Sequence, residues 1–258
     1  QRNMIQTAER ASSSSAVDNY VYQRCLFAYH ECKTRLHGRV LEIGTGSGLG
    51  LDILSEVCDE LVTIDKFATG IDMNSYNNVQ FIQMEIPPLH NIASNSFDFV
   101  ISFQVIEHIE DDHAFIQEIV RVLKPGGSAI LTTPNKLQSL TRNPWHVREY
   151  TGNELEQLMI TNGFNTVEKL GTFGNSKVND YIAINRASVR RITRFDIFNL
   201  QYRLPRRLLQ IPYDIFNRLN RNMIAEKNTG LNASLAANDF CISQQTDESL
   251  DLFFIGTK

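Results

Sequence analysis

Short apolar runs alternate with helix-like segments along the first half of this chain. Each run is about five to seven residues long and ends at a glycine, an acid or a polar turn, as strands do. The expected strands are 39–43, 60–64, 79–83, 97–103 and 128–133. Strands that alternate with helices in this way predict a mostly parallel sheet with helices on both faces.

The intervening segments carry helical spacing and helix-ending signals. Helices are expected at 17–36, 49–57 and 111–123, and the last of these ends at Lys124-Pro-Gly-Gly. Thr151 and Glu154 form a capping box that predicts the start of a fourth helix, which Gly163 ends.

Two more strands are expected after these helices, at 164–171 and 249–256. The pattern divides the chain into an N-terminal helical segment (1–37), a ligand-binding core (38–174), a helical insertion (175–245) and a final strand of the core sheet (246–258).

A glycine-rich loop follows the first expected strand. Glycine tolerates positive φ, so this backbone can turn tightly and lie against a ligand. The dinucleotide fingerprint G-x-G-x-x-G does not fit, because its third glycine would fall on Leu49 or Leu51. The loop instead reads Glu42-x-Gly44-x-Gly46-x-Gly48, which resembles motif I of the class I S-adenosylmethionine-dependent methyltransferases.

Further segments resemble this family in the expected order. Asp65 ends the second strand, 95–109 resembles the strand-four motif, and 123–135 resembles the strand-five motif. The sequences of these motifs are most similar to those of the type-11 group, which includes quinone-biosynthesis and other small-molecule enzymes. The resemblance implies a Rossmann-like class I methyltransferase fold, with a seven-stranded, mostly parallel sheet and a helical insertion before the last strand.

The resemblance also implies a set of residues that bind S-adenosyl-L-methionine and its product S-adenosyl-L-homocysteine. Asp65 would accept hydrogen bonds from the ribose hydroxyls, and Glu85 would meet the adenine amine, although the usual Gly-Asp spelling is absent there. The end of the fourth strand would hold the methionine portion. The full set is Glu42, Gly44, Thr45, Gly46, Gly48, Asp65, Lys66, Met84, Glu85, Ile86, Ser102, Phe103 and Gln104.

Two histidines are candidates for a general base. His146 lies in a segment that follows the fifth strand, together with the candidate substrate residues Trp145, Arg148 and Tyr150. His108 follows the fourth strand in a Glu-His pair that recurs in similar small-molecule methyltransferases. We favour His146 for substrate contact, and either histidine could instead orient its loop.

Composition limits the partners and the compartment. A net charge of −4 predicts no specific binding to nucleic acid. The four cysteines contain no C-x-x-C pair and accompany no histidine cluster, so reduced thiols and no metal site are expected. No apolar run reaches the roughly 18 residues of a spanning helix, and no secretory pattern opens the chain, so a cytoplasmic location is expected.

The insertion reverses the charge of the rest of the chain. Residues 175–223 contain ten lysines and arginines against three aspartates, with six tyrosines and phenylalanines among them. This segment could be a solvated cap that pairs with the acidic core, a lid that binds an anionic or phosphorylated substrate, or a surface that contacts an anionic membrane.

The sequence therefore predicts a methyltransferase that acts by in-line displacement on a small-molecule, lipid-linked or glycan-type acceptor. A non-catalytic cofactor-binding scaffold and a nicotinamide-dependent oxidoreductase are the alternatives. The oligomeric state is not predicted.

Overall fold

The computed structural model describes residues 16–194, 200–227 and 229–258. These residues divide into two compact units. The core unit comprises Leu26–Gln138, Val147–Phe173 and Ile242–Lys258, and the basic unit comprises 16–25, Ser139–His146 and the described part of Gly174–Cys241.

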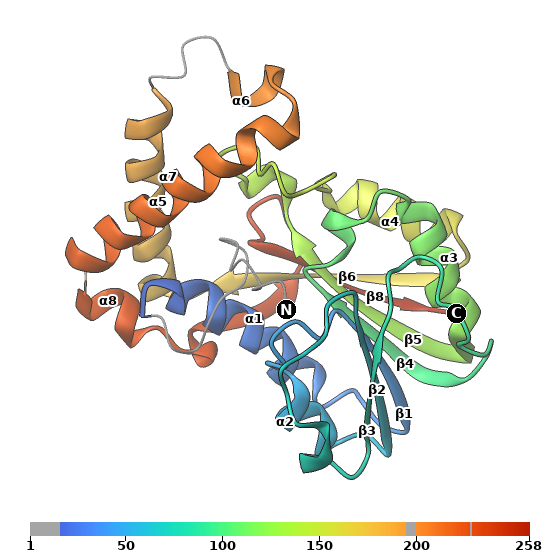
Figure 1. Cartoon of the computed structure of the whole chain (residues 1–258). Coiled ribbons are helices and arrows are strands. Elements are labelled where there is room, and N and C mark those ends of the chain that lie inside the picture. Colours follow the sequence, from blue (N-terminus) through green and yellow to red (C-terminus); the bar gives the residue numbers. More distant parts are fainter. Residues whose placement is uncertain (1–15, 195–199, 228) are drawn as a thin grey trace. The chain divides into compact units, whose positions relative to one another are not determined.

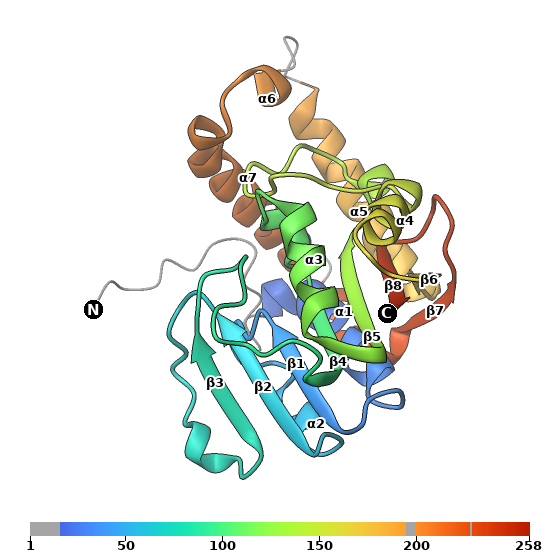
Figure 2. The same ribbon diagram turned by 90° about the vertical axis from the view of Figure 1, so that its right-hand side faces the viewer.

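The core unit is built on an eight-stranded sheet with the order β3-β2-β1-β4-β5-β8-β6-β7. Strands β1 to β5 run parallel to one another, whereas β8 runs antiparallel to both β5 and β6. Figure 2 shows β3, β2, β1, β4 and β5 side by side in this order. The strands are β1 (Arg39–Ile43), β2 (Glu60–Asp65), β3 (Val79–Gln83), β4 (Phe97–Phe103), β5 (Leu123–Pro134), β6 (Thr166–Gly174), β7 (Phe240–Gln244) and β8 (Asp251–Thr257).

Alternating side chains of these strands enter two separate hydrophobic clusters. Leu41 and Ile43 of β1 pack with helices α3 (Asp112–Val122) and α4 (Gly152–Thr161). Val40 packs on the other side with α2 (Leu51–Ser55) and the end of α1 (Asn19–Cys32). Because successive side chains of a strand point to opposite faces, a sheet with two apolar faces is covered by helices on both. The prediction of a mostly parallel α/β sheet is confirmed.

The predicted strand count was wrong by one. We expected seven strands and a helical insertion to residue 245, but β7 lies within that span and joins the edge of the sheet. Its apolar run covers only Phe240–Ile242 and most of its side chains are exposed, so the sequence carries no clear signal of a buried strand there. The fifth strand is also longer than expected, because Leu123 already pairs with Phe97.

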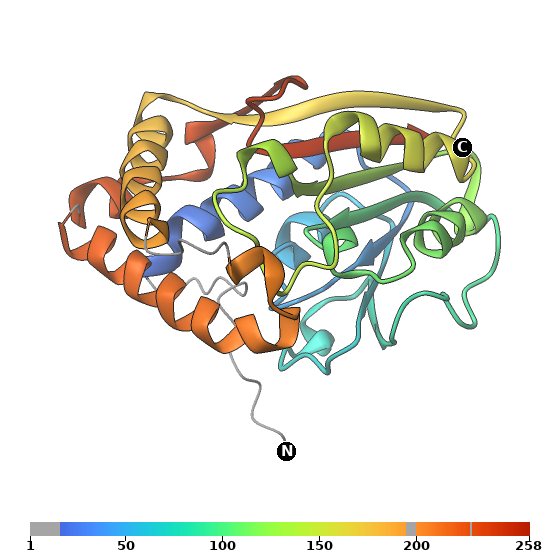
Figure 3. The same cartoon turned by 90° about the horizontal axis from the view of Figure 1, so that it is seen from above.

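The basic unit is mainly helical. It contains α5 (Ser176–Thr193), α6 (Leu200–Arg203), α7 (Arg206–Lys227), α8 (Thr229–Ser234) and the first half of α1. Figures 1 and 3 show α7, in orange, beside α5. The Tyr20 and Tyr181 rings stack with centroids 4.6 Å apart, which joins α1 to α5. Arg221 Nη1 lies 2.7 Å from Oδ1 of Asp18, the residue before α1, so α7 is tied to the same end of that helix.

Short 3-10 turns complete the described structure: η1 (Ala16–Asp18), η2 (Met73–Ser75), η3 (Ile106–His108), η4 (Lys136–Gln138) and η5 (Ala237–Asp239). Among the described helices, none combines the length and the apolar character that crossing a membrane requires.

Candidate functional site

The glycine loop connects β1 to α2 and uses the backbone freedom that its sequence predicts. Gly44, Gly46 and Gly48 have φ angles of +100°, +56° and +80°, in the region that side chains disfavour. A Cβ on Gly44 would lie 2.5 Å from Val105 Cγ2. The N–H groups of Gly44 and Thr45 both donate to the Ile64 carbonyl, at 2.8 and 3.1 Å, so the start of the loop is fixed to β2.

Asp65 lies where the resemblance places it, at the end of β2 beside the glycine loop. Its Oδ2 accepts a hydrogen bond from Gly46 N at 2.8 Å, and its Oδ1 accepts one from Phe67 N at 2.9 Å. A carboxylate has about four lone-pair positions, so both oxygens can accept further donors. Asp65 thus joins two loops, and its contact with ribose remains a prediction.

A buried polar group lies beneath the glycine loop. Tyr29 Oη donates to Glu42 Oε1 at 2.8 Å, and Thr63 Oγ1 donates to Glu42 Oε2 while it also contacts Thr45 Oγ1. Glu42 is 2% exposed. Burial disfavours the charged carboxylate and raises the pKa of Glu42 to about 7, although the two hydroxyl donors oppose this shift.

Tyr29 is a member of this group that the sequence did not reveal. Its ring meets Phe103 edge to face with centroids 4.9 Å apart. It also fills the space beside Gly50, where a Cβ would lie 2.0 Å from the ring. Tyr29 therefore contacts three segments of the predicted cofactor site.

The segment after β3 lies next to Asp65. Met84 N donates to the Asp65 carbonyl at 2.9 Å. The half-buried side chains of Met84 and Ile86 pack against the core, while Glu85 is exposed. Lys66 is exposed as well, with its ammonium 5.1 Å from the Phe67 ring centroid. The exposed Glu85 carboxylate suits a ligand contact, which remains a prediction.

The end of β4 contains a buried hydroxyl that lacks a partner. Ser102 is 2% exposed, and its Oγ makes no hydrogen bond to any residue that the structure describes. Gln104 adopts a positive φ of +57°, and its Nε2 lies 3.3 Å from Thr132 Oγ1 and 3.2 Å from Asp251 Oδ1. An unpaired buried hydroxyl costs about 1–3 kcal/mol, so Ser102 Oγ fits a position that a bound ligand completes.

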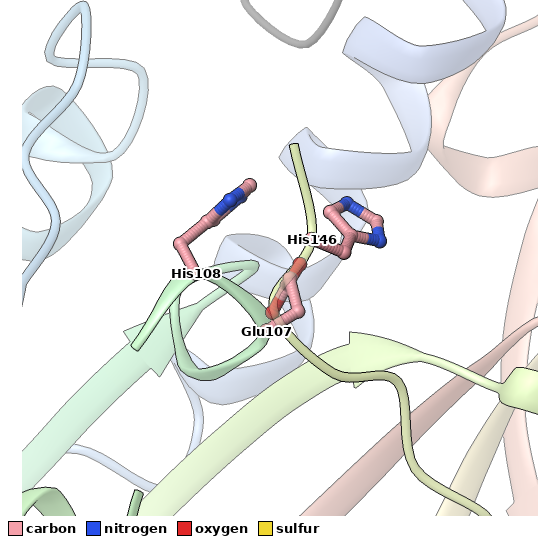
Figure 4. Close-up of side chains that lie close together, drawn as sticks. All are labelled: Glu107, His108 and His146. Atoms are coloured by element: carbon pink, nitrogen blue, oxygen red, sulfur yellow. The ribbon is translucent and has the colours of Figure 1, made fainter. Parts of the chain in front are cut away.

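The Glu-His pair lies on η3, directly after β4 (Figure 4). Glu107 is buried and accepts a hydrogen bond from Thr133 Oγ1 at 2.9 Å, and its carbonyl accepts one from Val147 N at 2.7 Å. The side chain of His108 is half-buried. Glu107 therefore anchors the turn that carries His108.

His146, also labelled in Figure 4, ends the loop Ser139–His146 of the basic unit. Asn143 Oδ1 accepts a hydrogen bond from Trp145 N at 3.0 Å, so the Asn143 amide directs its Nδ2 to His146 Nε2 at 2.9 Å. Nε2 thus accepts this hydrogen bond, and Nδ1 carries the proton of the neutral ring. Within the same unit, Trp145 Nε1 donates to Asp214 Oδ1 at 2.9 Å and Arg206 Nη1 donates to the His146 carbonyl at 3.3 Å.

Arg148 and Tyr150, both predicted to contact the substrate, converge on Asp112 at the start of α3. Arg148 Nη1 lies 2.7 Å from Asp112 Oδ2, and Tyr150 Oη donates to the same oxygen at 2.8 Å. Tyr150 is 1% exposed. In this structure the hydroxyl of Tyr150 is therefore part of the core, while the exposed Arg148 remains a candidate for the substrate.

The geometry suits the predicted donor. A loop with three positive φ angles, a carboxylate at the end of the next strand and an unpaired buried hydroxyl at the end of β4 all belong to the core unit. The glycine loop, Asp65, the segment around Glu85 and the β4 end are the residues that would hold S-adenosylmethionine.

Comparisons with known proteins agree with this interpretation. The model of a methyltransferase-domain family matches residues 18–169. A probable S-adenosylmethionine-dependent methyltransferase of Mycolicibacterium smegmatis is 29% identical, over 98% of this chain and 94% of its own length. The mitochondrial ubiquinone biosynthesis O-methyltransferase of Rattus norvegicus is 31% identical over 39% of this chain and 32% of its own length.

A solved structure shares the fold. A possible histamine N-methyltransferase from Thermotoga maritima superposes with a TM-score of 0.53 at 16% identity, covering 93% of this chain and 92% of its own. The family match and the Mycolicibacterium smegmatis relative favour the methyltransferase over the nicotinamide-dependent oxidoreductase. The chain belongs to the methyltransferase-domain family and is an S-adenosylmethionine-dependent methyltransferase.

Proposed function

We propose that the methyl acceptor is a small molecule, or the polar end of a lipid- or glycan-linked molecule, and that it carries negative charge. The observation behind this proposal is the excess of ten cations over three acids in residues 175–223 of a chain whose net charge is −4. Arginine binds phosphate and carboxylate groups through paired N–H donors, so an arginine-rich segment favours an anionic acceptor.

The insertion and the loop that contains His146 are connected by arginines from both sides. Arg142, from that loop, donates to the carbonyls of Gln201 and Leu204, both at 3.2 Å. Arg206 donates to the His146 carbonyl. Arg190, Arg191 and Arg203 are exposed, so they are the candidates for contact with an anionic acceptor.

The bound donor supplies a sulfonium methyl group that is already a strong electrophile. The residues of the chain then have to hold the acceptor in line with that methyl group, which can lower the barrier by about 7–11 kcal/mol. Where the acceptor atom must lose a proton, a general base adds about 10²–10⁴-fold.

His146 and His108 remain the two candidates for that base. Because the Nε2 lone pair of His146 accepts a hydrogen bond from Asn143, this bond must break before Nε2 can take a proton. The variants His146→Gln and His108→Gln keep a polar side chain and remove the titrating ring. The base is the residue whose replacement abolishes the acid limb of the pH–rate profile.

The acceptor class can be tested with the purified protein and methyl-labelled S-adenosylmethionine. Polar metabolite, lipid and glycan fractions of a cell extract are incubated separately, and the labelled product is identified by mass spectrometry. We expect label in an anionic product of one of these fractions, and much less of it with Asp65→Ala at a donor concentration below saturation. Label that appears only in nucleic acid or protein would refute the proposed acceptor class.

A further inference from the structure

Helix α7 of the basic unit has an inverted distribution of apolar and polar side chains. Its inward side makes polar contacts: Asn220 Nδ2 donates to Asn185 Oδ1 at 2.8 Å, and Arg221 pairs with Asp18. Asp214 on the same helix accepts the Trp145 indole N–H. A helix that packs on a protein core normally turns its apolar stripe inward. On α7, Ile224 is the only large apolar side chain that is buried among the described residues.

The outward side of α7 is apolar over about four turns. The large apolar side chains on it are spaced three or four residues apart, except for one adjacent pair, which places them on one face. They are Leu208 (64% exposed), Ile211 (72%), Ile215 (54%), Phe216 (54%), Leu219 (51%) and Met223 (40%). Soluble monomers rarely expose contiguous apolar patches larger than a few hundred Å², so a face of this kind indicates an interaction surface.

Arginines border this face. Arg207 and Arg218 are exposed along one edge of it, and the exposed positions between Arg207 and Met223 include no aspartate or glutamate. Long arginine side chains can place their charge at lipid headgroups while their stems lie along apolar surface. An apolar helix face with a basic border is the pattern of a helix that lies in the plane of a membrane interface.

We propose that the outer face of α7 binds the surface of an anionic lipid bilayer, with the apolar side chains among the acyl chains and Arg207 and Arg218 at the headgroups. A second copy of the chain fits this face less well, because the face offers no carboxylate to the arginines of a partner copy. This proposal goes beyond the methyl transfer reaction and does not depend on the identity of the acceptor.

Vesicle co-sedimentation of the full chain, without donor or acceptor, tests the proposal. Phosphatidylcholine vesicles are compared with vesicles that also contain phosphatidylglycerol. We expect binding to the anionic vesicles that weakens as salt is raised, because screening reduces the arginine contribution. The double variant Arg207→Gln/Arg218→Gln should lose about 30-fold in affinity for anionic vesicles.

The apolar contribution is tested with the double variant Ile211→Asp/Ile215→Asp, whose affinity for anionic vesicles should fall by more than about tenfold. Ile160→Asp is the matched control, because Ile160 is 40% exposed on α4 of the core unit, and it should bind as the wild type does. Circular dichroism verifies that each variant folds. The proposal is overturned if the wild-type protein does not bind the anionic vesicles. It is also overturned if Ile160→Asp loses as much affinity as Ile211→Asp/Ile215→Asp. A dimer that Ile211→Asp/Ile215→Asp dissociates, without lipid binding, would assign the face to a second copy instead.

Discussion

Replacing Tyr29 with phenylalanine removes one hydroxyl from beneath the glycine loop and leaves the ring in place. The ring still packs against Phe103 and Gly50, so no cavity forms. The lost contact is the 2.8 Å hydrogen bond to Glu42 Oε1. Because this hydroxyl stabilises the charged carboxylate, the variant should raise the pKa of Glu42 above its value of about 7.

The loss of stability caused by Tyr29→Phe should depend on pH. Above pH 7 the wild-type Glu42 is ionised, and a hydrogen bond to a charged group contributes about 1.5–3 kcal/mol to stability. At low pH the carboxyl is neutral, and the same contact contributes about 0.5–1.5 kcal/mol. In wild type, a folded pKa of about 7 against 4.5 in the unfolded chain means that stability falls as pH rises between these values and then levels off.

Thermal unfolding at several pH values measures this effect. With about 2–4 °C per kcal/mol for a chain of this size, Tyr29→Phe should lower Tm by roughly 4–8 °C near pH 8 and by about half as much near pH 5.5. Tyr150→Phe is the matched control, since it also removes a buried hydroxyl that donates to a carboxylate, Asp112, outside the glycine-loop group. A Tyr29→Phe effect that is equal at both pH values would refute the assignment of a neutral-range pKa to Glu42.

Three further predictions concern the cofactor and the acceptor. Asp65→Ala should weaken S-adenosylhomocysteine binding by about 10- to 100-fold in calorimetry, because the ribose loses a charged acceptor and Gly46 N loses its partner; unchanged affinity would argue against the ribose assignment. Gly50→Ala should lower both Tm and cofactor affinity, because its Cβ would meet the Tyr29 ring, whereas Gly70→Ala, with no atom within 4 Å, should change neither. His146→Ala should leave cofactor affinity nearly unchanged while turnover falls, and full turnover would make His146 an architectural residue.

The sequence predicted the parallel half of the sheet well. The bounds of β1, β3 and β4 agree residue for residue with the expected strands, because each is an apolar run that ends at a glycine or a polar turn. The capping box of Thr151 and Glu154 forms as expected at the start of α4. Strand β7 was missed because only one of its five side chains is buried, and backbone pairing at a sheet edge holds it in place.

The site was predictable where a motif specifies the backbone and less so where distant side chains meet. The positive φ angles of Gly44 and Gly46 and the place of Asp65 follow from the glycine spacing. The hydrogen bond between Tyr29 and Glu42 connects α1 to β1, and no local sequence pattern predicts such a contact. The Tyr150 contact with Asp112 spans 38 residues, so a pattern read along the chain assigned the tyrosine to the substrate instead.

Strand β8 lies between β5 and β6, although it follows both of them in the chain. On the ribosome, the parallel strands can therefore assemble first, while the edge of β5 stays open until residues 251–257 emerge from the exit tunnel. Premature termination upstream of Asp251 would remove the strand that connects β6 to β5, so this sheet closes only after its other strands have been translated.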